Sequence, residues 1–338
     1  MPLAIQLMRK LAVFIALFWV VTSACKRQDS ADSLPTSGKV NTISVIIDDQ
    51  LWNGQVGDSI RNTFAAPVLG LPQEEPLFDI NQFPVKLLEG FVTSTRNILV
   101  VKKAKTTAYE LVENEYATPQ NVFHISGKTA YSILEVIRQN APDIIQKMQQ
   151  TEIVENQRLL DTSHISTAAV KKKFGVDIHL PTGYTMAMKS KKFLWYKKEI
   201  TSGNLSVLIY QVPFHRVKTT NLIKSISKIR DSIGRLFIHG SYPNTQMITD
   251  KSYTPYLFKT KIRSKETFVT KGTWELRNDH MDGPFINYCI VDYPRNRMLI
   301  VEGFCYAPST PKRDLMFELE SIIKSVEFLK KSKPKHAK

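Results

Sequence analysis

The sequence is short of cysteine, of long apolar runs and of acidic residues. Three cysteines in 338 residues exclude a small scaffold held together by disulfides. No apolar run reaches the roughly 18 residues that a membrane-spanning helix needs. Apolar residues make up 43% and charged residues 23% of the chain, which excludes a disordered, collagen-like or coiled-coil protein. The length allows two domains or one large domain.

The chain also lacks the short motifs that mark common enzymes. It contains no nucleotide-binding glycine motif, no Walker loop, no Cys-x-x-Cys and no His-Glu-x-x-His. Gly57-Asp58-Ser59-Ile60-Arg61 begins like the Gly-x-Ser-x-Gly elbow of hydrolases but ends in arginine. Because catalytic groups can lie far apart in sequence, this disfavours an enzyme without excluding one. We therefore assign no catalytic residue, no metal ligand and no cofactor.

Residues 1–24 have the layout of a signal peptide. Two basic residues precede an apolar run from Leu11 to Val21, which at 1.5 Å per residue spans about half of a bilayer core. Small residues then lead to Cys25, and this junction resembles a bacterial lipobox. The resemblance implies that Cys25 becomes the first mature residue and carries acyl chains such as palmitate. Ordinary secretion, with Cys25 as a plain thiol, is the alternative.

Residues 25–41 are polar, contain Pro35 and Gly38, and offer nothing to bury. We predict that they form the lipidated cysteine and a flexible tether, with a reach of about 20–24 Å. Two or more acyl chains would hold the protein firmly on a membrane, since each buried methylene contributes about 0.8 kcal/mol.

Basic residues are concentrated in the second half of the chain. Residues 40–160 hold 10 basic and 14 acidic side chains, a net charge of −4, whereas residues 161–338 hold 31 and 15, a net charge of +16. We expect the second half to bind anionic surfaces such as phospholipid, lipid A phosphates or acidic glycans, and the first half not to. No zinc-finger, RNP-like or helix-turn-helix pattern supports binding to nucleic acid. The alternative is that the lysines only keep the protein soluble.

Two groups of lysines lie on or beside strand-like runs. We interpret them as the solvated face of a sheet, with attraction to an anionic envelope surface as the alternative. They are Lys189, Lys191, Lys192, Lys197 and Lys198, and then Lys259, Lys261 and Lys265.

Hydrophobic periodicity predicts an α+β fold of two units, each a mainly antiparallel sheet packed by amphipathic helices. The first unit covers residues 42–163 and the second 164–330, with a basic tail at 331–338. In the second unit we expect four strands, a helix, four strands and a last helix, with both helices on one face of the sheet. In the first unit Pro142 interrupts a helical pattern, so we expect a kink or a new helix there.

Cys289 and Cys305 lie in two apolar runs joined by a turn at residues 293–296. A hairpin centred there places Cys289 opposite about residue 300, which leaves Cys305 on the order of 15 Å away. A disulfide needs Cα atoms within about 7 Å. We therefore predict two buried, unpaired thiols.

Two acidic clusters are candidates for chemistry. Asp279-His280-Met281-Asp282 offers two carboxylates and an imidazole for a divalent metal, but it lacks further ligands and is typical of a solvated turn. Glu74 and Glu75, with Asp79 nearby, could supply acid and base groups if desolvated. Adjacent glutamates on a proline-rich loop are more typical of an exposed loop.

Several segments resemble an uncharacterised family of envelope lipoproteins from Bacteroidetes-type bacteria, a domain of unknown function. The resemblance implies a cell-envelope lipoprotein and supplies no activity, cofactor or catalytic residue. Separately, residues 176–196 are similar to the PsbP/Mog1-like α/β sandwiches, which bears on the fold only. The segments that carry the family resemblance are residues 49–54, 71–79, 272–276, 278–279, 301–304, 306–308 and 312–314.

Together these features favour a membrane-anchored envelope lipoprotein that acts as a non-enzymatic binding or assembly module. Its expected partners are the membrane, through the lipid on Cys25, and an anionic envelope surface or another envelope protein. The outer membrane is the favoured location, and whether the body faces the periplasm or the cell surface is left open. The alternative is an envelope hydrolase that uses loop carboxylates such as Glu74 or Asp79.

Overall fold

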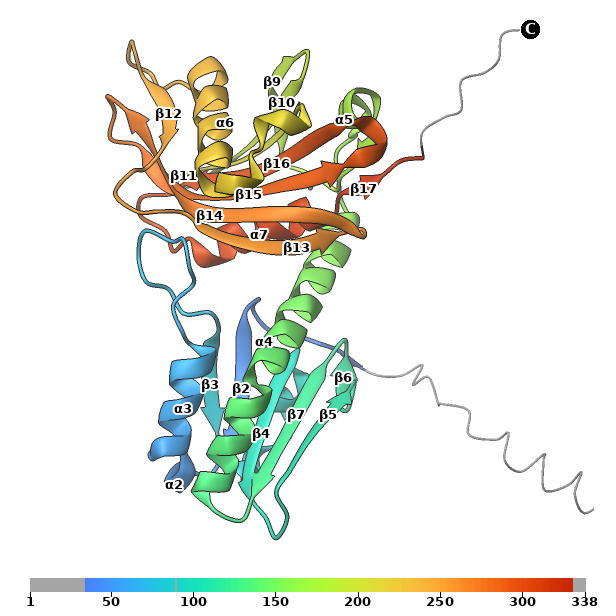
Figure 1. Ribbon diagram of the computed structural model, residues 1–338. Coiled ribbons are helices and arrows are strands. Elements are labelled where there is room, and N and C mark those ends of the chain that lie inside the picture. The colour runs from blue at the N-terminus through green and yellow to red at the C-terminus, as the bar shows by residue number, and fades with distance from the viewer. Residues whose placement is uncertain (1–33, 89, 331–338) are drawn as a thin grey trace, which may run out of the picture. The chain divides into compact units, whose positions relative to one another are not determined.

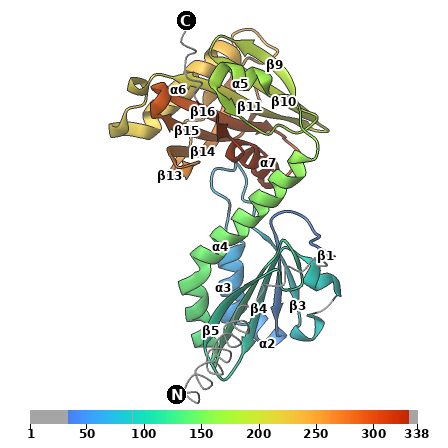
Figure 2. The same ribbon diagram turned by 90° about the vertical axis from the view of Figure 1, so that its right-hand side faces the viewer.

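Two β-sheets organise the computed structural model, which describes residues 34–88 and 90–330 (Figures 1 and 2). Four of the sequence predictions concern residues outside these ranges: the signal peptide, the lipidated Cys25, the tether up to residue 33 and the basic tail at 331–338. The described residues from Pro35 onward form one compact body, in which first unit and second unit denote residues 42–163 and 164–330. In the described ranges no helix is long and apolar enough to cross a membrane.

The first sheet has five strands in the order β3-β2-β4-β7-β5. Short elements, β1 (Leu34–Pro35), β6 (Ala117–Thr118) and the 3₁₀ turns η1 (Val85–Leu87) and η2 (Gly90–Ser94), accompany it. Its strands and helices are β2 (Thr42–Ile47), α2 (Asp49–Trp52), α3 (Gln55–Phe64), β3 (Asp79–Phe83), β4 (Asn97–Lys103), β5 (Ala108–Glu113), β7 (Asn121–Gly127) and α4 (Ala130–Asp161).

The first sheet is mainly parallel, which corrects the antiparallel pairing that we expected for this unit. β2 runs parallel to β3 and to β4, and β4 runs parallel to β7; the pair β5–β7 alone is antiparallel. A helical connection such as α3 returns the chain to the same end of the sheet, so the next strand is parallel. The apolar runs at 45–47 and 98–101 carry this signal, because strands buried on both faces lose the alternation of polar and apolar residues.

Both faces of the first sheet are buried. Val45 and Ile47 face α3 and α4, which contribute Ile60, Phe64 and Ile137 among others to the larger apolar cluster. The intervening Ile46 belongs to the cluster on the opposite face, beneath the segment that contains η1 and η2.

Helix α4 continues through Pro142 without a break, so no new helix begins there. It starts with a capping box in which the Thr129 hydroxyl accepts a hydrogen bond from the Ser132 N–H. Near its end, Asn156 and Gln157 donate hydrogen bonds to Ser321 (3.0 and 2.9 Å). The helix therefore contacts elements of both sheets.

The second sheet has eight strands in the order β12-β14-β15-β16-β11-β10-β9, with β13 also paired to β14. Every pairing in it is antiparallel, as predicted. A separate pair of short strands is formed by β8 (Val176–Asp177) and β17 (Glu327–Phe328). The other elements of this half are α5 (Ala168–Phe174), β9 (Thr185–Ser190), β10 (Phe193–Ile200), β11 (Gly203–Val212), η3 (Phe214–Arg216), η4 (Thr219–Asn221), α6 (Leu222–Phe237), β12 (Gln246–Thr249), β13 (Tyr256–Ile262), β14 (Lys265–Arg277), β15 (Asp282–Asp292), η5 (Tyr293–Arg295), β16 (Arg297–Tyr306) and α7 (Arg313–Lys324).

The two long helices of this unit lie on opposite faces of the sheet, not on one face as we expected. Leu208 and Tyr210 of β11 pack with α6, whereas the alternate residues Val207 and Ile209 pack with α5 and α7. β15 and β16 are buried along almost their whole length, because helices cover both faces of the sheet. Their sequences are mainly apolar, with Asn287 and Glu302 as the polar exceptions in the middle, which is typical of strands covered on both faces.

The register of the β15–β16 hairpin confirms the cysteine prediction. Cys289 pairs with Ile300, and both Cys289 and Cys305 are free and buried. Burial raises the pKa of each thiol to about 12. Neither cysteine is a nucleophile at neutral pH.

The α+β class and the amphipathic helices are confirmed, but the last residues of the tether that we expected over residues 25–41 are folded. Thr36 and Ser37 donate backbone hydrogen bonds to Thr118 and Ser94 (3.1 and 2.8 Å). Asn41 is buried and donates to the Asp314 carboxylate (3.0 Å). Residues 36–41 therefore belong to the folded body, because their polar groups find partners there.

Candidate anion-binding site

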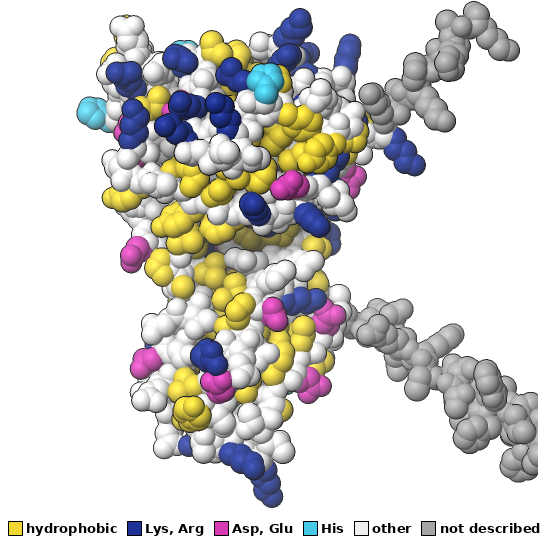
Figure 3. Space-filling model, in the orientation of Figure 1, with side chains coloured by type: hydrophobic (Ala, Val, Ile, Leu, Met, Phe, Trp, Pro, Cys, Tyr) yellow, Lys and Arg dark blue, Asp and Glu magenta, His cyan; other side chains and the backbone are white. Residues whose placement is uncertain are grey.

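An open cleft of about 1180 Å³ lies along helix α6 in the second unit. Its walls come from the loop that contains η3, from α6, and from β12 and β14. In Figure 3 the Lys and Arg side chains gather over the region where Figure 1 draws α6 and β12. We call this feature the α6 cleft.

Seven of the residues that line the α6 cleft are basic, and all seven are exposed. None of them has an ion-pair or side-chain hydrogen-bond partner among residues 34–88 and 90–330, whereas many other Lys and Arg side chains are paired. Like charges that share one concave surface raise the local positive potential and favour an anionic ligand. The seven are Arg216, Lys218, Lys224, Lys228, Arg235, Lys251 and Arg277.

Two acidic residues also line the cleft, and they do not neutralise this charge. The Asp231 carboxylate accepts hydrogen bonds from the Thr249 N–H and hydroxyl (2.7 and 2.8 Å), which ties α6 to β12. Glu275 is exposed on β14. Seven cations against two carboxylates leave the cleft strongly positive.

The sequence of α6 places three of the cations on one side of the helix. The Asn221 side chain caps its start by accepting from the Lys224 N–H (3.1 Å). Lys224, Lys228 and Arg235 then follow at spacings of four and seven residues, which lie on one helix face. The apolar stripe with Ile226 and Ile229 packs on the sheet.

A buried charge network lies under α6. Arg230 and Glu302 are 1% and 0% exposed and form an ion pair of 2.8 Å. Asn287 donates a second hydrogen bond to the Glu302 carboxylate (2.7 Å), and Arg230 also donates to Thr249 (3.1 Å). The guanidinium lies 3.8 Å from the centre of the Phe285 ring. Burial raises the pKa of Glu302 despite the opposing charge of Arg230.

The lysines singled out in the sequence lie outside the α6 cleft. Lys197, Lys198 and Lys265 form ion pairs with Glu199, Glu318 and Asp292. The others lie on or beside β9, β10 and β13, as the solvated-sheet interpretation expected.

Two of the three candidate carboxylates, Glu75 and Asp79, bind the start of α7. The Glu75 carboxylate accepts hydrogen bonds from the N–H groups of Lys312 and Arg313 (2.6 and 2.8 Å), at the start of α7. Asp79 pairs with the Arg313 guanidinium, whose hydrogen bond lowers the pKa of that carboxyl. Glu74 is exposed. Glu75 and Asp79 are therefore structural partners of one helix end, and the geometry lends no support to the hydrolase alternative.

The Asp279–Asp282 segment is a turn between β14 and β15. The Asp279 carboxylate accepts from the His280 N–H (2.7 Å), and the backbone N–H of Asp279 bonds to Leu276. In the described ranges no group of three or more His, Cys, Asp or Glu side chains could hold a metal ion.

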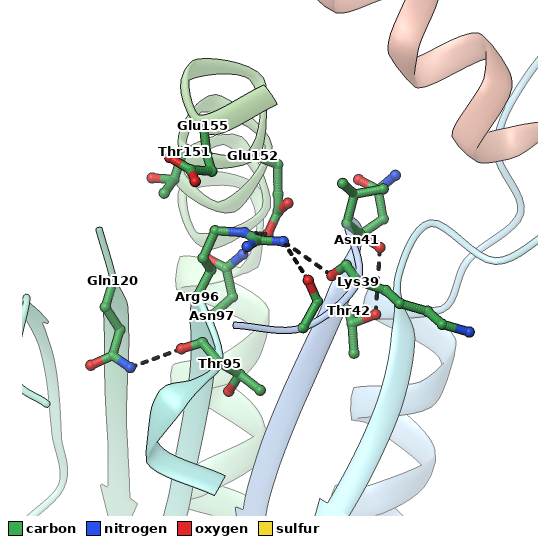
Figure 4. Close-up of polar contacts among 12 residues, drawn as sticks. Lys39, Asn41, Thr42, Thr95, Arg96, Asn97, Gln120, Thr151, Glu152 and Glu155 are labelled. Atoms are coloured by element: carbon green, nitrogen blue, oxygen red, sulfur yellow. Dashed lines mark hydrogen bonds and ion pairs between the residues drawn. The ribbon is translucent and has the colours of Figure 1, made fainter. Parts of the chain in front are cut away.

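The first unit contains a second buried charge, at the amino ends of its parallel strands (Figure 4). Glu152 of α4 accepts hydrogen bonds from Arg96 (3.0 Å) and Asn97 (2.9 Å). Asn121 links Asn97 to Thr151 (2.9 Å each). Arg96 also donates to the carbonyls of residues 38 and 39, so this cluster fixes the start of β2.

Two family models match the chain. Residues 163–325 match a domain of unknown function, DUF4837, and residues 36–161 match another, DUF8532. The chain is therefore similar to two domains of unknown function, one in each half. The α6 cleft lies entirely within the DUF4837 match, and the Glu152 cluster lies within the DUF8532 match.

Individual proteins are at most distantly similar to the chain. No curated protein matches the chain. The Ran-binding protein Mog1p of Saccharomyces cerevisiae is similar with 7% identity and a TM-score of 0.32, over 49% of this chain and 95% of its own. An E65A mutant of Mog1 is similar with 9% identity and a TM-score of 0.32, over 50% of this chain and 97% of its own. At this level the similarity carries no argument about function.

The cleft cations were not identified from the sequence because they come from four separate segments between residues 216 and 277. Only Lys224, Lys228 and Arg235 share a helical face that the sequence pattern could have revealed. The net charge of +16 on residues 161–338 indicated the sign of the surface but not its place.

Proposed function

We propose that this protein is a lipid-anchored, non-enzymatic binding module of the cell envelope, and that its DUF4837 domain binds anionic ligands in the α6 cleft. The observation that carries the proposal is a set of seven cations in one open cleft that have no ion-pair partner in the described part of the chain. The signal-peptide pattern and the lipobox-like junction at Cys25 support the anchor.

The charges of the cleft favour a bound anion. Each Lys or Arg near an anionic surface contributes about 1 kcal/mol, and the effect decays over a Debye length of about 8 Å at physiological salt. Three cations on α6 would therefore contribute about 3 kcal/mol, which corresponds to roughly a hundredfold in affinity.

The test measures the affinity of the unlipidated chain from Lys26 for fluorescently labelled inorganic polyphosphate at low and high salt. We expect salt-sensitive binding, and we expect the triple variant Lys224→Ala, Lys228→Ala, Arg235→Ala to lose at least about tenfold in affinity. Alanine favours helix, and these side chains are exposed, so the variant should fold normally.

A matched control removes the same charge elsewhere. Lys189, Lys259 and Lys261 are exposed and have no ion pair among the described residues. Replacing all three by alanine should leave polyphosphate binding close to that of the unchanged chain. Equal losses in both triple variants would mean that net charge, and not the α6 cleft, attracts the ligand.

A further inference from the structure

We propose that the anion held by the α6 cleft is the phosphate layer of a lipid bilayer, and that Leu236 and Tyr242 insert into this bilayer beside the cleft. The inference rests on the proposed function and names its ligand. It concerns a surface contact by the folded domain and is separate from the lipid on Cys25.

The chemistry of the cleft favours a lipid surface over a sugar or a nucleic acid. Among its lining residues there is no Trp, Tyr or Phe, and the His215 imidazole is the one ring, so the cleft offers little surface on which a sugar or a base could stack. Its cations come from the η3 loop, α6, the segment after β12, and β14. A layer of many phosphates can pair with cations spread over such an open surface, whereas one small anion would reach only a few of them.

Exposed apolar side chains lie at the end of the same helix and in the loop beyond it. Leu236 is 64% exposed and Tyr242 is 67% exposed. Leu236 lies on the same face of α6 as Ser225, Ile229 and Ser232, which line the cleft. Tyr242 precedes Thr245 and Gln246, and Gln246 also lines the cleft.

Basic and apolar groups together are the pattern of a membrane-surface contact. Single exposed apolar residues are common in proteins and would mean nothing alone. Beside unpaired cations they can enter the headgroup region while the cations contact phosphate, and a tyrosine there keeps its hydroxyl in the polar layer. Leu236 follows Arg235 directly, so both interactions would come from one turn of α6.

The test compares vesicles with a soluble anion, using the unlipidated chain from Lys26. Co-sedimentation is measured with vesicles of phosphatidylcholine alone and with vesicles that also contain phosphatidylglycerol, and polyphosphate binding is measured in parallel. We expect binding to the anionic vesicles only. The double variant Leu236→Ser, Tyr242→Ser should bind these vesicles about tenfold more weakly and bind polyphosphate unchanged.

The control is a double variant at exposed apolar residues of α4, Tyr131→Ser with Val154→Ser, which are 78% and 57% exposed. It should bind vesicles like the unchanged chain, and circular dichroism should show that both double variants remain folded. Unchanged vesicle binding by Leu236→Ser, Tyr242→Ser would overturn the insertion. Binding of polyphosphate but not of anionic vesicles would overturn the lipid ligand and leave the proposed function standing. Binding of neither would overturn both.

Discussion

Arg230 and Glu302 depend on each other because both are buried. Removing one of the two side chains would leave the charge of the other buried without water and without a partner, which costs about 3–5 kcal/mol of stability. We therefore expect Arg230→Met to lower the free energy of unfolding by about that amount in urea titrations. The double variant Arg230→Met, Glu302→Met should lose much less, because it removes both charges and keeps the side-chain volume. Equal losses in the two variants would show that packing, not charge, sets the cost.

The same pair predicts how stability depends on pH. Burial raises the pKa of Glu302 above its unfolded value, so its favourable contribution is present below the unfolded pKa and is lost as pH rises through the folded pKa. Because the charge of Arg230 opposes this effect, removing Arg230 raises the pKa of the Glu302 carboxyl further. The stability deficit of Arg230→Met should therefore shrink as the pH falls from about 7 to about 5. A deficit that does not change with pH would contradict this account.

Glu75 and its neighbour Glu74 allow a matched comparison of a structural and an exposed carboxylate. Glu75 accepts two backbone hydrogen bonds at the start of α7, whereas Glu74 is exposed. Loss of such a cap costs about 1 kcal/mol. We expect Glu75→Ala to lower the free energy of unfolding by about that amount and Glu74→Ala to leave it unchanged. If Glu74→Ala were the more destabilising of the two, this role of Glu75 would be wrong.

At the scale of elements, α6 can lie close to β12 because it carries a glycine at the contact. A Cβ added to Gly234 would lie 2.0 Å from the Met247 carbonyl oxygen, so α6 would have to move away from β12. Gly234→Ala should lower stability by about 1–3 kcal/mol in thermal unfolding, and it should weaken polyphosphate binding because both elements line the cleft. Ser227→Ala on the same helix is the control and should change neither. Normal stability in Gly234→Ala would refute the close contact.

The elements that the sequence predicted best are those set by local patterns. The strand Tyr256–Ile262, the span of α6 and the turn at residues 293–296 all follow from periodicity and turn residues. The face that each helix covers was missed, because it depends on chain connections that periodicity does not encode. The cleft was missed for a similar reason, since sheet pairing brings Arg277 and Lys251 toward cations of α6 that are distant in sequence.

At the scale of the whole chain, the proposal gives the protein two attachments to one membrane. The acyl chains on Cys25 would hold it permanently, and the α6 cleft would bind phosphate reversibly and in a salt-dependent way. Once the anchor is in place, the second contact becomes intramolecular, so even a weak cleft would be occupied. The two attachments should therefore respond differently to salt and to mutation.

Cell fractionation of a bacterium that expresses each form separates the two attachments. We expect the natural chain to stay with the membranes through a high-salt wash, and mass spectrometry to find a lipid-modified Cys25 at its N-terminus. Its variant with Lys224, Lys228 and Arg235 replaced by alanine should also stay, because the acyl chains suffice. A form exported by an ordinary signal peptide and starting at Lys26 should bind membranes at low salt and leave them at high salt, since screening weakens only the cleft contact. A mature chain that begins elsewhere would refute the anchor, and an unlipidated form that is soluble at low salt would refute the cleft contact.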